Sequence, residues 1–518
     1  MYMRFISTTE RNFLQAVTGL AASNPFLPEH TAFERSALGE DFVEGEPIWS
    51  LPVDQPERPR ANIWRIAARL ENLVPQLRER LHSGVSAHAH ERELYENAVE
   101  RLLYQRFYSR FYDATFGAAS RLPGRWQFYR EFLADWRHFF HPSLHLPSGQ
   151  EPRHNPSHTF ACFRQIQRAF DQILRDIIGG SLAAARLRAS VWQSIFTHDM
   201  PRYRRTLYAR MGEFATLITG PSGTGKELAA HAIAQSRYLA FDDSSLTFPG
   251  ESVALFYPIN ISALSPTLVE SELFGHRRGS FTGAIADRKG WLETCPEQGS
   301  VFLDELGDLD PGIQVKLLRV IETRTFHPVG STAARQFRGK LIAATNRDLA
   351  ARSAKGEFRE DLYYRLCSDQ IVTPSLAEQI AGSYAALQEM IVYMTRRVAG
   401  ADADTDAAGL AQDVTQWIDR NLGRDYAWPG NYRELEQCVK NLLIRRDYRP
   451  LRVSTPAPFG DIAADLAEGR LTADDLLTRY CTLVYRRTHS YEETARRLDL
   501  DRRTVKSKVD RGLLRELP

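Results

Sequence analysis

The first 170 residues carry apolar side chains at the spacing of amphipathic helices. The repeat is clearest in the segment that begins near Trp64, where apolar residues follow one another at steps of three and four: Ile66, Leu70, Leu73, Val74 and Leu77. Pro75 falls inside this segment, and we expect it to kink the helix or to end it early. Two further helices are predicted at about 91–116 and 126–140, so the N-terminal domain is expected to be mainly helical.

Aromatic side chains crowd the second and third of these predicted helices. They are Tyr104, Phe107, Tyr108, Phe111, Tyr112, Phe128, Tyr129, Phe132, Trp136, Phe139 and Phe140. One interpretation is a ring-lined pocket that senses a ligand. The other, and the more ordinary one, is a helical core packed with large residues.

A stretch rich in proline and serine, 141–158, has the composition of a linker. It contains four histidines: His141, His145, His154 and His158. Their spacing fits no familiar set of metal ligands, so we expect solvated loop histidines rather than a metal site.

From about residue 170 onward, helical stretches alternate with short runs rich in β-branched and aromatic residues. These runs fall at 214–219, 255–261, 301–303 and 341–344. Strands that alternate with helices predict a mostly parallel sheet with helices on both faces. The strands stop after about Pro374, and 376–446 has the pattern of helices. A linker broken by prolines follows at 450–459, and the last fifty or so residues are again helical.

The overall composition narrows the class of protein but says little about its partners. Of 518 residues, 43% are hydrophobic and 25% are charged, which is typical of soluble globular proteins and excludes a disordered or collagen-like chain. The formal net charge is only +2, so only local patches of charge can point to a partner. At this length, three or four domains are expected.

Cysteine usage and apolar runs bear on the compartment. The cysteines are Cys162, Cys295, Cys367, Cys438 and Cys481. They are far apart in the sequence and form no Cys-x-x-Cys pair, which argues against a disulfide framework or a zinc site. No run of 18 apolar residues occurs, and charged residues occupy the start of the chain where a secretory signal needs an apolar stretch. We therefore expect a cytoplasmic protein without a membrane span.

A glycine-rich segment between a β-rich run and a helix-forming stretch carries the first chemical signal. Glycines allow backbone N–H groups to surround a phosphate, and the lysine ammonium can reach the β- and γ-phosphates. The usual pattern continues with serine or threonine after the lysine, whereas this chain has a glutamate. The alternative is a simple glycine-rich turn before a helix. The residues predicted to bind nucleotide are Gly220, Pro221, Ser222, Gly223, Thr224, Gly225, Lys226 and Glu227.

Two acidic residues end the apolar run 301–303, and a second polar tip ends the next run. At the carboxyl end of a parallel strand, such residues face the ligand crevice. Asp304 would hold Mg²⁺, and Glu305 would act as the general base that polarises the attacking water. Thr345 and Asn346 would sense the γ-phosphate or position water. Together with the lysine loop, these residues predict ATP hydrolysis.

With these motifs in view, residues 175–450 resemble the AAA+ ATPase domain of sigma-54-dependent transcription activators, the bacterial enhancer-binding proteins. In that family a glutamate follows the P-loop lysine, as Glu227 does here. The most diagnostic match is Glu270-Ser-Glu-Leu-Phe-Gly-His276, which precedes a glycine-flanked loop. In the family this loop projects from the ATPase ring and touches the sigma factor. The resemblance therefore assigns the sigma-factor contact to Gly279, Ser280, Phe281, Thr282, Gly283 and Ala284.

Further roles carry over from the resemblance. Asn260 matches the asparagine that holds the catalytic glutamate in an inactive pose. Arg359 and Arg365 match the two arginine fingers that reach the γ-phosphate in a neighbouring subunit. Arg433, in Trp428-Pro-Gly-Asn-Tyr-Arg-Glu-Leu435, matches the nucleotide-sensing arginine of the lid.

One residue and two segments depart from the family pattern. Ser280 stands where the family usually has alanine. Residues 241–252 look like an inserted loop. The segment that starts at Thr373 replaces a more usual Leu-Pro-Pro-Leu-Arg-Glu-Arg sequence between core and lid.

The C-terminal end has the pattern of a helix-turn-helix. A capped helix is predicted at 490–498, a turn at 499–501 and a second helix at 502–511, with Ala495 at the tight crossing. Leu498, Leu500 and Val505 are expected to form its core. The segment 486–515 has ten basic and five acidic residues, which favours DNA binding over a bundle that merely packs. The residues expected to face DNA are Arg502, Arg503, Thr504, Lys506 and Lys508.

The patterns and the resemblance together predict five segments: a helical N-terminal regulatory domain (1–170), an α/β AAA+ core (175–375), a helical lid (376–450), a linker (451–470) and a helix-turn-helix domain (471–518). The resemblance implies a homo-oligomer, expected to be a hexamer, that binds enhancer DNA and uses ATP and Mg²⁺ to remodel the promoter complex of sigma-54 RNA polymerase. Two alternatives are a DNA-bound repressor or scaffold with weak ATPase, and an AAA+ remodeller of another client.

Overall fold

A computed structural model describes residues 4–45, 61–117, 125–140, 155–251, 254–381, 383–399, 404–424, 426–450 and 471–510. The chain forms two compact units, which comprise 1–448 and 449–518. Three parts of the sequence-based predictions lie outside the described residues: the linker 451–470, the segment 141–154 and the chain from 511 onward.

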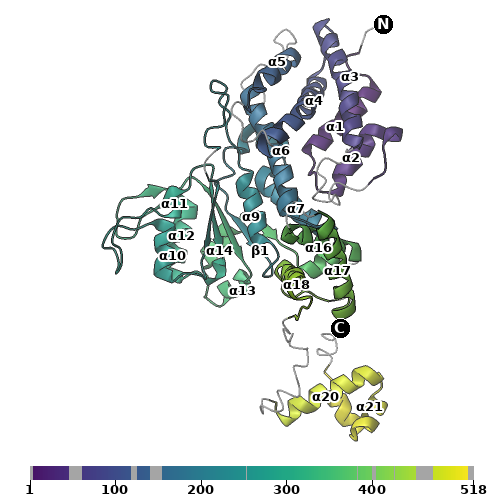
Figure 1. The fold of residues 1–518 in the computed structure, drawn as a ribbon, viewed down its shortest axis with the longest axis vertical. Coiled ribbons are helices and arrows are strands. Elements are labelled where there is room, and N and C mark those ends of the chain that lie inside the picture. Colours follow the sequence, from purple (N-terminus) through teal and green to yellow (C-terminus); the bar gives the residue numbers. More distant parts are fainter. Residues whose placement is uncertain are drawn as a thin grey trace. The chain divides into compact units, whose positions relative to one another are not determined.

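The N-terminal region is helical, as predicted. Its elements are α1 (Thr8–Ala22), α2 (Pro28–Leu38), the 3₁₀-helix η1 (Gly39–Asp41), α3 (Ala61–His82), α4 (Ala89–Thr115) and α5 (Tyr129–Phe139) (Figure 1). The periodic pattern did not reveal α1 and α2. Of the two effects expected of Pro75, a kink or an early end, the early end is wrong, because α3 continues to His82. Val74 and Leu77 on either side of the proline are fully buried, and this packing offsets the lost backbone hydrogen bond.

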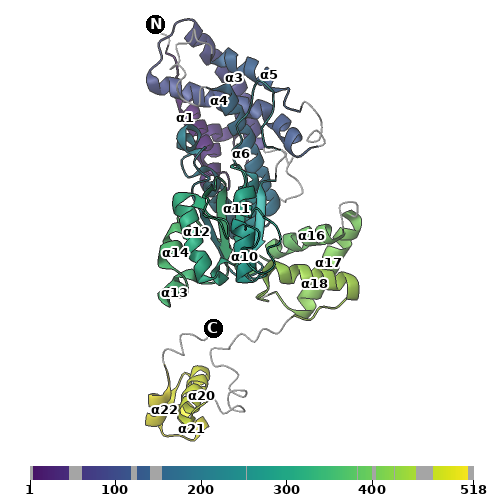
Figure 2. The ribbon, with the colours of Figure 1, turned by 90° about the vertical axis from the view of Figure 1, so that its left-hand side faces the viewer.

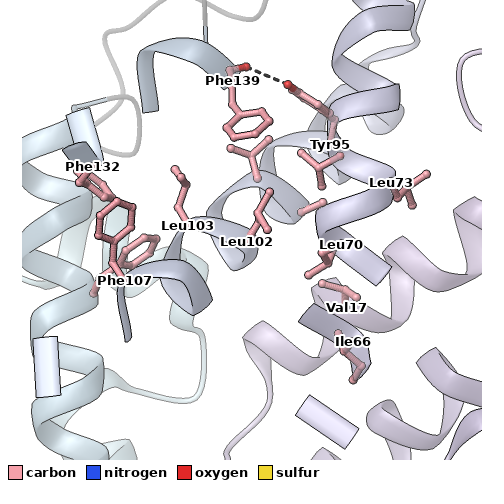
Figure 3. Packing of buried hydrophobic residues seen from close by; sticks show 14 of the residues in the cluster. Val17, Ile66, Leu70, Leu73, Tyr95, Leu102, Leu103, Phe107, Phe132 and Phe139 are labelled. Atoms are coloured by element: carbon pink, nitrogen blue, oxygen red, sulfur yellow. Dashed lines mark hydrogen bonds between the residues drawn. The ribbon is translucent and has the colours of Figure 1, made fainter. Parts of the chain in front are cut away.

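The apolar stripes of these helices meet in one core (Figure 3). Leu70 of α3 packs with Leu102 of α4 and Val17 of α1 in this cluster. Tyr95 is buried among them, and its hydroxyl donates a hydrogen bond of 2.9 Å to the carbonyl oxygen of Phe139. The buried phenol is therefore satisfied, as a polar group in a core must be.

One helix, α6 (Pro156–Asp176), crosses the boundary predicted at residue 170. Asn155 caps it by accepting hydrogen bonds from two backbone N–H groups of its first turn. Phe160 belongs to the N-terminal core, whereas Phe170 and Ile173 belong to the core under the parallel sheet. The N-terminal region and the sheet domain thus share one helix. The proline at its first turn is a good helix starter, but in the sequence it resembled linker punctuation.

His158 lies in the first turn of α6 and is buried, so the prediction of a solvated loop histidine is wrong for this residue. Its ring nitrogens lie 2.8 Å from the Tyr238 hydroxyl and 2.8 Å from the carbonyl oxygen of Arg204. The other three histidines of the predicted linker lie outside the described residues.

The central sheet has the strand order β2-β3-β6-β1-β7, and all its pairings are parallel. Its strands are β1 (Thr216–Thr219), β2 (Phe256–Asn260), β3 (Ser300–Asp304), β6 (Lys340–Thr345) and β7 (Gln370–Val372). Four of them match the predicted β-rich runs. The edge strand β7 has only three residues, too few for a periodic signal.

Helices cover both faces of the sheet, as predicted. Val301 and Leu303 point to one face and Phe302 to the other, which is the alternation expected of a strand buried on both sides. The first face is covered by α10 (Pro266–Phe274), α12 (Pro311–Thr323) and α14 (Glu360–Leu366). The second face is covered by α6, α7 (Leu182–Phe196) and α9 (Lys226–Gln235) (Figure 1).

Short elements complete this domain. The chain enters β1 from α8 (Met200–Arg202) and the π-helix η6 (Tyr203–Leu207). A two-stranded hairpin, β4 (Thr325–Phe326) with β5 (Arg335–Gln336), follows α12. The remaining pieces are α11 (Trp291–Thr294), η7 (Leu306–Asp308) and α13 (Leu349–Ala354).

The loop after α9 contains the predicted insertion, of which 241–251 is described, and it docks on the N-terminal helices. Phe248 is buried, and its ring centroid lies 4.8 Å from that of Trp126. Glu251 accepts a 2.7 Å hydrogen bond from the buried guanidinium of Arg164. The insertion therefore supplies part of the N-terminal core.

A helical lid follows the sheet, as predicted for 376–446. It consists of α15 (Leu376–Ile380), α16 (Tyr384–Ala399), α17 (Asp404–Asn421) and α18 (Asn431–Arg445). Figure 2 shows α16, α17 and α18 gathered in one group. They enclose a separate core around Trp428, Leu435 and Val414.

The second unit contains α20 (Ala473–Thr488), α21 (Tyr491–Leu498) and α22 (Arg502–Lys508). Ala495 and Val505 are buried together, and Leu498 and Leu500 pack against them, as predicted. Among the described residues, none of the helices combines the length and apolar character needed to cross a bilayer.

Candidate functional site

The glycine-rich loop leaves the end of β1 and enters α9. Gly223 and Gly225 have φ angles of 78° and 86°, in the left-handed region that favours glycine. This conformation turns the chain tightly enough for α9 to begin at Lys226, so the helix N-terminus faces the loop. Such a terminus presents free N–H groups to an anion.

Lys226 lies in this loop and is mostly buried. Its ammonium donates 3.0 Å hydrogen bonds to the carbonyl oxygens of Gly220 and Pro221. Burial lowers the pKa of Lys226, and the charges of Glu305 and Asp304 oppose that shift. The loop therefore holds a cation at its mouth, next to two carboxylates.

Asp304 and Glu305 end β3 and line the same cavity as Lys226, whose volume is about 270 Å³. Glu305 has a φ of 55°, an uncommon backbone conformation for a residue other than glycine. Its N–H donates a 3.0 Å hydrogen bond to the Asp304 carboxylate. Backbone strain of this kind clusters at functional sites.

Asn260 pairs in register with Asp304 on the neighbouring strand. Its amide donates to the Asp304 carboxylate at 3.5 Å, and its oxygen accepts from Ser262 at 2.8 Å. Within the described part of the chain, the hydrogen bond to Glu305 that the resemblance implied is absent. Asn260 is the strand partner of Asp304, whereas Glu305 follows the strand in a left-handed backbone conformation and is not paired with Asn260.

The predicted tip of β6 lies at the same edge of the sheet. Thr345 is fully buried, and its hydroxyl accepts a 3.0 Å hydrogen bond from the N–H of Arg347. Asn346 is exposed. Since β6 lies between β3 and β1, both residues stand between the carboxylates and the glycine loop.

The lid closes over the glycine loop. The Arg433 guanidinium donates a 3.2 Å hydrogen bond to the Ser222 hydroxyl, as expected of a lid residue that faces the P-loop. Asn431 adds a 2.9 Å hydrogen bond to the Ser222 carbonyl oxygen, and the Tyr432 N–H donates to Gly223. Sequence analysis missed these two contacts, although both residues stand in the motif that identified Arg433.

The other end of the cavity is apolar, and sequence analysis missed it as well. It is lined by Ile177 and Ile178 after α6, by Leu187 of α7 and by Met394 of the lid. These residues are far apart in sequence, so no local motif could have revealed them. A cavity with a cationic loop at one end and an apolar wall at the other can hold a nucleotide, with the phosphates at the loop and the base against the apolar wall.

The glycine-flanked loop 279–284 is compact. The Gly279 N–H donates 2.8 Å to the Ala284 carbonyl oxygen, and Gly279 and Gly283 both have positive φ. The Phe281 ring packs edge-on against His276, with centroids 4.9 Å apart, and Thr282 is exposed. The loop is therefore a defined turn, with the phenylalanine half-buried.

A second segment, between β4 and β5, supports this turn, and sequence analysis missed it. The Arg277 N–H donates 3.0 Å to the Val329 carbonyl oxygen, and the Val329 N–H donates 2.9 Å to Gly275. Ser280 lies against Gly330, and its hydroxyl is buried without a hydrogen-bond partner in the described structure. Val329 and Gly330 lie about fifty residues after loop 279–284 in the sequence, so no local motif links the two segments.

Comparison with known proteins shows what this region is similar to. A family model described as the sigma-54 interaction domain matches residues 200–372. By this match, residues 200–372 are similar to the sigma-54 interaction domain. The resemblance to sigma-54-dependent transcription activators is thus confirmed, and so is the predicted fold class: an AAA+ core with a helical lid, helices before it and a helix-turn-helix after it.

Relatives of the sigma-54 interaction domain are regulatory proteins by name. The chain is 38% identical over 283 residues to the Nif-specific regulatory protein of Herbaspirillum seropedicae. The aligned region covers 54% of this chain and 44% of that protein. It is 39% identical over 256 residues to the transcriptional regulatory protein GlrR of Escherichia coli K12, and this alignment covers 48% of this chain and 52% of GlrR. A crystal structure of NtrX from Brucella abortus aligns with 67% of this chain and 72% of that one at 26% identity and a TM-score of 0.38. The chain spans about half the length of these curated relatives.

The two arginines predicted as fingers of the sigma-54 interaction domain lie outside the cavity of their own chain. Arg359 is exposed and pairs with Asp361 at 2.7 Å. Arg365 is exposed and pairs with Glu322 at 3.2 Å. Neither lines the nucleotide cavity among the described residues.

The basic side chains predicted to face DNA lie on α22 in the second unit. Arg503 and Lys506 are exposed, and Arg502 pairs with Glu492 at 3.1 Å. Thr504 is half-buried. Lys508 is also half-buried and pairs with Asp474 of α20, so it ties two helices of the unit together.

Proposed function

We propose that this protein is an ATP-dependent activator of sigma-54 RNA polymerase that binds DNA through its second unit. One observation carries the proposal: a sigma-54 interaction domain places a cationic glycine loop, two carboxylates and an apolar wall around one cavity. The same domain presents the ordered loop 279–284 at its surface.

The cavity fits ATP as substrate. Backbone N–H groups of the glycine loop and Lys226 would hold the phosphates, while Ile178 and Met394 would contact the base. Mg²⁺ is typically bound by one or two carboxylates together with substrate phosphates, so Asp304 would be its protein ligand. The bound ion would neutralise charge on the phosphates.

Glu305 would take the proton from the attacking water, because it is the second carboxylate of the cavity and is not hydrogen-bonded to Asn260 within the described structure. Exposed Arg359 and Arg365 would reach the site of a neighbouring subunit, where a guanidinium stabilises charge that develops on the γ-phosphate. The protein would therefore act as a homo-oligomer, and the resemblance favours a hexamer.

ATP hydrolysis would move loop 279–284 against the sigma factor, and this movement would remodel the promoter complex. Phe281 packs on His276, which follows α10 on a covered face of the sheet, so a shift of that face would reach the loop. Exposed Arg503 and Lys506 would contact the phosphates of enhancer DNA.

Phe281→Ala tests the remodelling step. We expect the ATPase rate to stay within about twofold of the wild type, because Phe281 lies outside the cavity, and open-complex formation by sigma-54 polymerase to fall at least about tenfold, as for loss of an aromatic interface anchor. Ile285→Ala, an exposed apolar change next to the loop, is the control and should leave both activities intact. If open complexes form normally with Phe281→Ala, a repressor, a scaffold or a remodeller of another client would replace this proposal.

A further inference from the structure

A second cavity in the described structure is separate from the nucleotide site. It lies where the N-terminal helices meet α6, α7, α8 and η6, and its volume is about 550 Å³. This volume is in the range of pockets that take small molecules. Its walls come from α1, α4 and α6 on one side and from the segment that leads into β1 on the other.

Two faces of α4 account for both interpretations of the aromatic-rich sequence. Phe107 and Phe111 point into the N-terminal core and are buried there. Tyr104, Tyr108 and Tyr112 recur at steps of four on another face of the helix, and all three line the cavity. A packed core and a ring-lined pocket thus share one helix.

Rings from other helices complete this wall. Phe163 of α6 meets Tyr104 edge-on at 5.4 Å between centroids, and Phe170 and Trp192 also line the cavity. Ring faces and edges supply broad apolar contact with little loss of side-chain entropy, and they favour a flat ligand.

The charged lining is uneven. Glu100 is buried, and it accepts a 2.6 Å hydrogen bond from Arg204 of η6, so these two charges compensate each other. Arg101 and Asp113 also line the cavity, and the Arg101 guanidinium lies 5.8 Å from the centre of the Tyr104 ring. Arg205 lines the cavity too, is exposed, and forms no ion pair with any residue that the structure describes. Arginines outnumber carboxylates in the lining, so a single negative charge on a ligand would be matched.

We propose that this cavity binds a small, flat, largely apolar molecule that carries one anionic group. The tyrosine face of α4 and the rings of α6 and α7 hold the body of the ligand. Arg205 binds the anionic group, since guanidinium forms strong charge-assisted hydrogen bonds with such groups. Arg204 and Arg205 lie on the π-helix that leads into β1, so occupancy would also alter the entry to the ATPase core; this second step rests on the proposed function.

Two fluorescent probes of nearly the same shape test the binding site. One is 8-anilinonaphthalene-1-sulfonate, a flat aromatic anion, and the other is N-phenyl-1-naphthylamine, which lacks the sulfonate. Each is titrated into the full chain, with energy transfer from Trp192 and Trp64, which line the cavity, as the readout. No ATPase measurement is needed, so failure here is distinct from failure of the proposed function.

Variants identify the place and the charge preference. Ser109→Trp fills the cavity from an exposed position of α4, and Gln105→Trp does so from a second position should the first fail to fold. Arg205→Gln removes the anion contact. Arg202→Gln, an exposed arginine of α8 that does not line the cavity, is the matched control.

We expect the wild type and Arg202→Gln to bind both probes, and the folded filling variants to bind neither. Arg205→Gln should weaken binding of the anionic probe about tenfold, the usual loss for a hydrogen bond to a charged group, and change the neutral probe less than about twofold. Binding that survives the filling variants would place the probes elsewhere and overturn the proposal. Equal loss of both probes with Arg205→Gln would overturn the anionic preference.

Discussion

At the scale of single residues, His158 shows how strongly surroundings set chemistry. Burial lowers its pKa to about 4 from an ordinary value of 6.5; the positive charge of Arg204 acts in the same direction, and the hydrogen bond to the Arg204 carbonyl opposes it. The neutral ring therefore joins α6, η6 and the Tyr238 hydroxyl. Protonation of this ring would place a charge beside Arg204, at the junction between the N-terminal helices and the sheet domain.

This environment predicts a dependence of stability on pH. The pKa of His158 is lower in the folded than in the unfolded state, so its contribution is complete above pH 6.5 and is lost as the pH falls toward about 4. The free energy of unfolding should decrease by up to about 3 kcal/mol across this window because of His158. Urea denaturation of the wild type at pH values between 4.5 and 7.5 measures the slope.

His158→Gln isolates this contribution, because an amide can still donate to the Arg204 carbonyl but does not titrate. All other groups titrate alike in both proteins, so the difference between the two curves reports His158 alone. The variant should lose less stability on acidification than the wild type. Parallel curves for the two proteins would contradict the assignment of a neutral, buried ring.

At the scale of elements, the loop 241–251 fastens the sheet domain to the N-terminal helices. Phe241 and Phe248 are buried with their ring centroids 4.9 Å apart. The Arg164 guanidinium lies 4.4 Å from the centre of the Phe248 ring and also pairs with Glu251. One loop thus brings the Phe248 ring and the Glu251 carboxylate to the same arginine.

Phe248→Ala should therefore destabilise the N-terminal region by about 3–5 kcal/mol, the usual cost of removing a buried phenylalanine ring. Tryptophan fluorescence during urea unfolding is a suitable readout, because Trp126 contacts Phe248. Pro249→Ala changes an exposed neighbour in the same loop and should cost less than about 1 kcal/mol. If both changes lower the free energy of unfolding by the same small amount, the loop does not stabilise the N-terminal region.

Local patterns predicted the elements whose signal is local. The glycine loop around Lys226, the carboxylates after β3 and the stripe of α3 each lie in one short segment, and all appear where they were predicted. Features built from distant segments were missed: Ile178 and Met394 meet only through the packing of the lid on the segment after α6, and Val329 supports loop 279–284 only through tertiary backbone hydrogen bonds. Edge strand β7 was missed because three residues are too short for periodicity.

At the scale of the whole molecule, the proposed catalysis between subunits makes a prediction that a single chain cannot satisfy. Glu305→Gln should lower the ATPase rate by about 10²–10⁴-fold through loss of the general base. Arg359→Ala should lower it by about 10³-fold or more through loss of the finger. When the two inactive proteins are mixed, some interfaces combine an intact Glu305 with an intact Arg359, so part of the wild-type rate should return.

Lys226→Ala mixed with Glu305→Gln is the matched control. Both changes disable the cavity of their own chain, so no assembly of these two proteins contains a complete site, and the mixture should remain inactive. Absence of recovery in the first mixture, although both proteins assemble, would place Arg359 outside the reaction.

The helix α6 has a consequence for how this protein can be rebuilt or recombined. Its first half belongs to one hydrophobic core and its second half to another, under a single Asn155 cap. A chimera spliced near residue 170 would strip the cap and leave the remaining turns without their partners. The N-terminal region of this chain is therefore not an interchangeable module, and grafts onto another AAA+ core should carry the entire helix from Asn155.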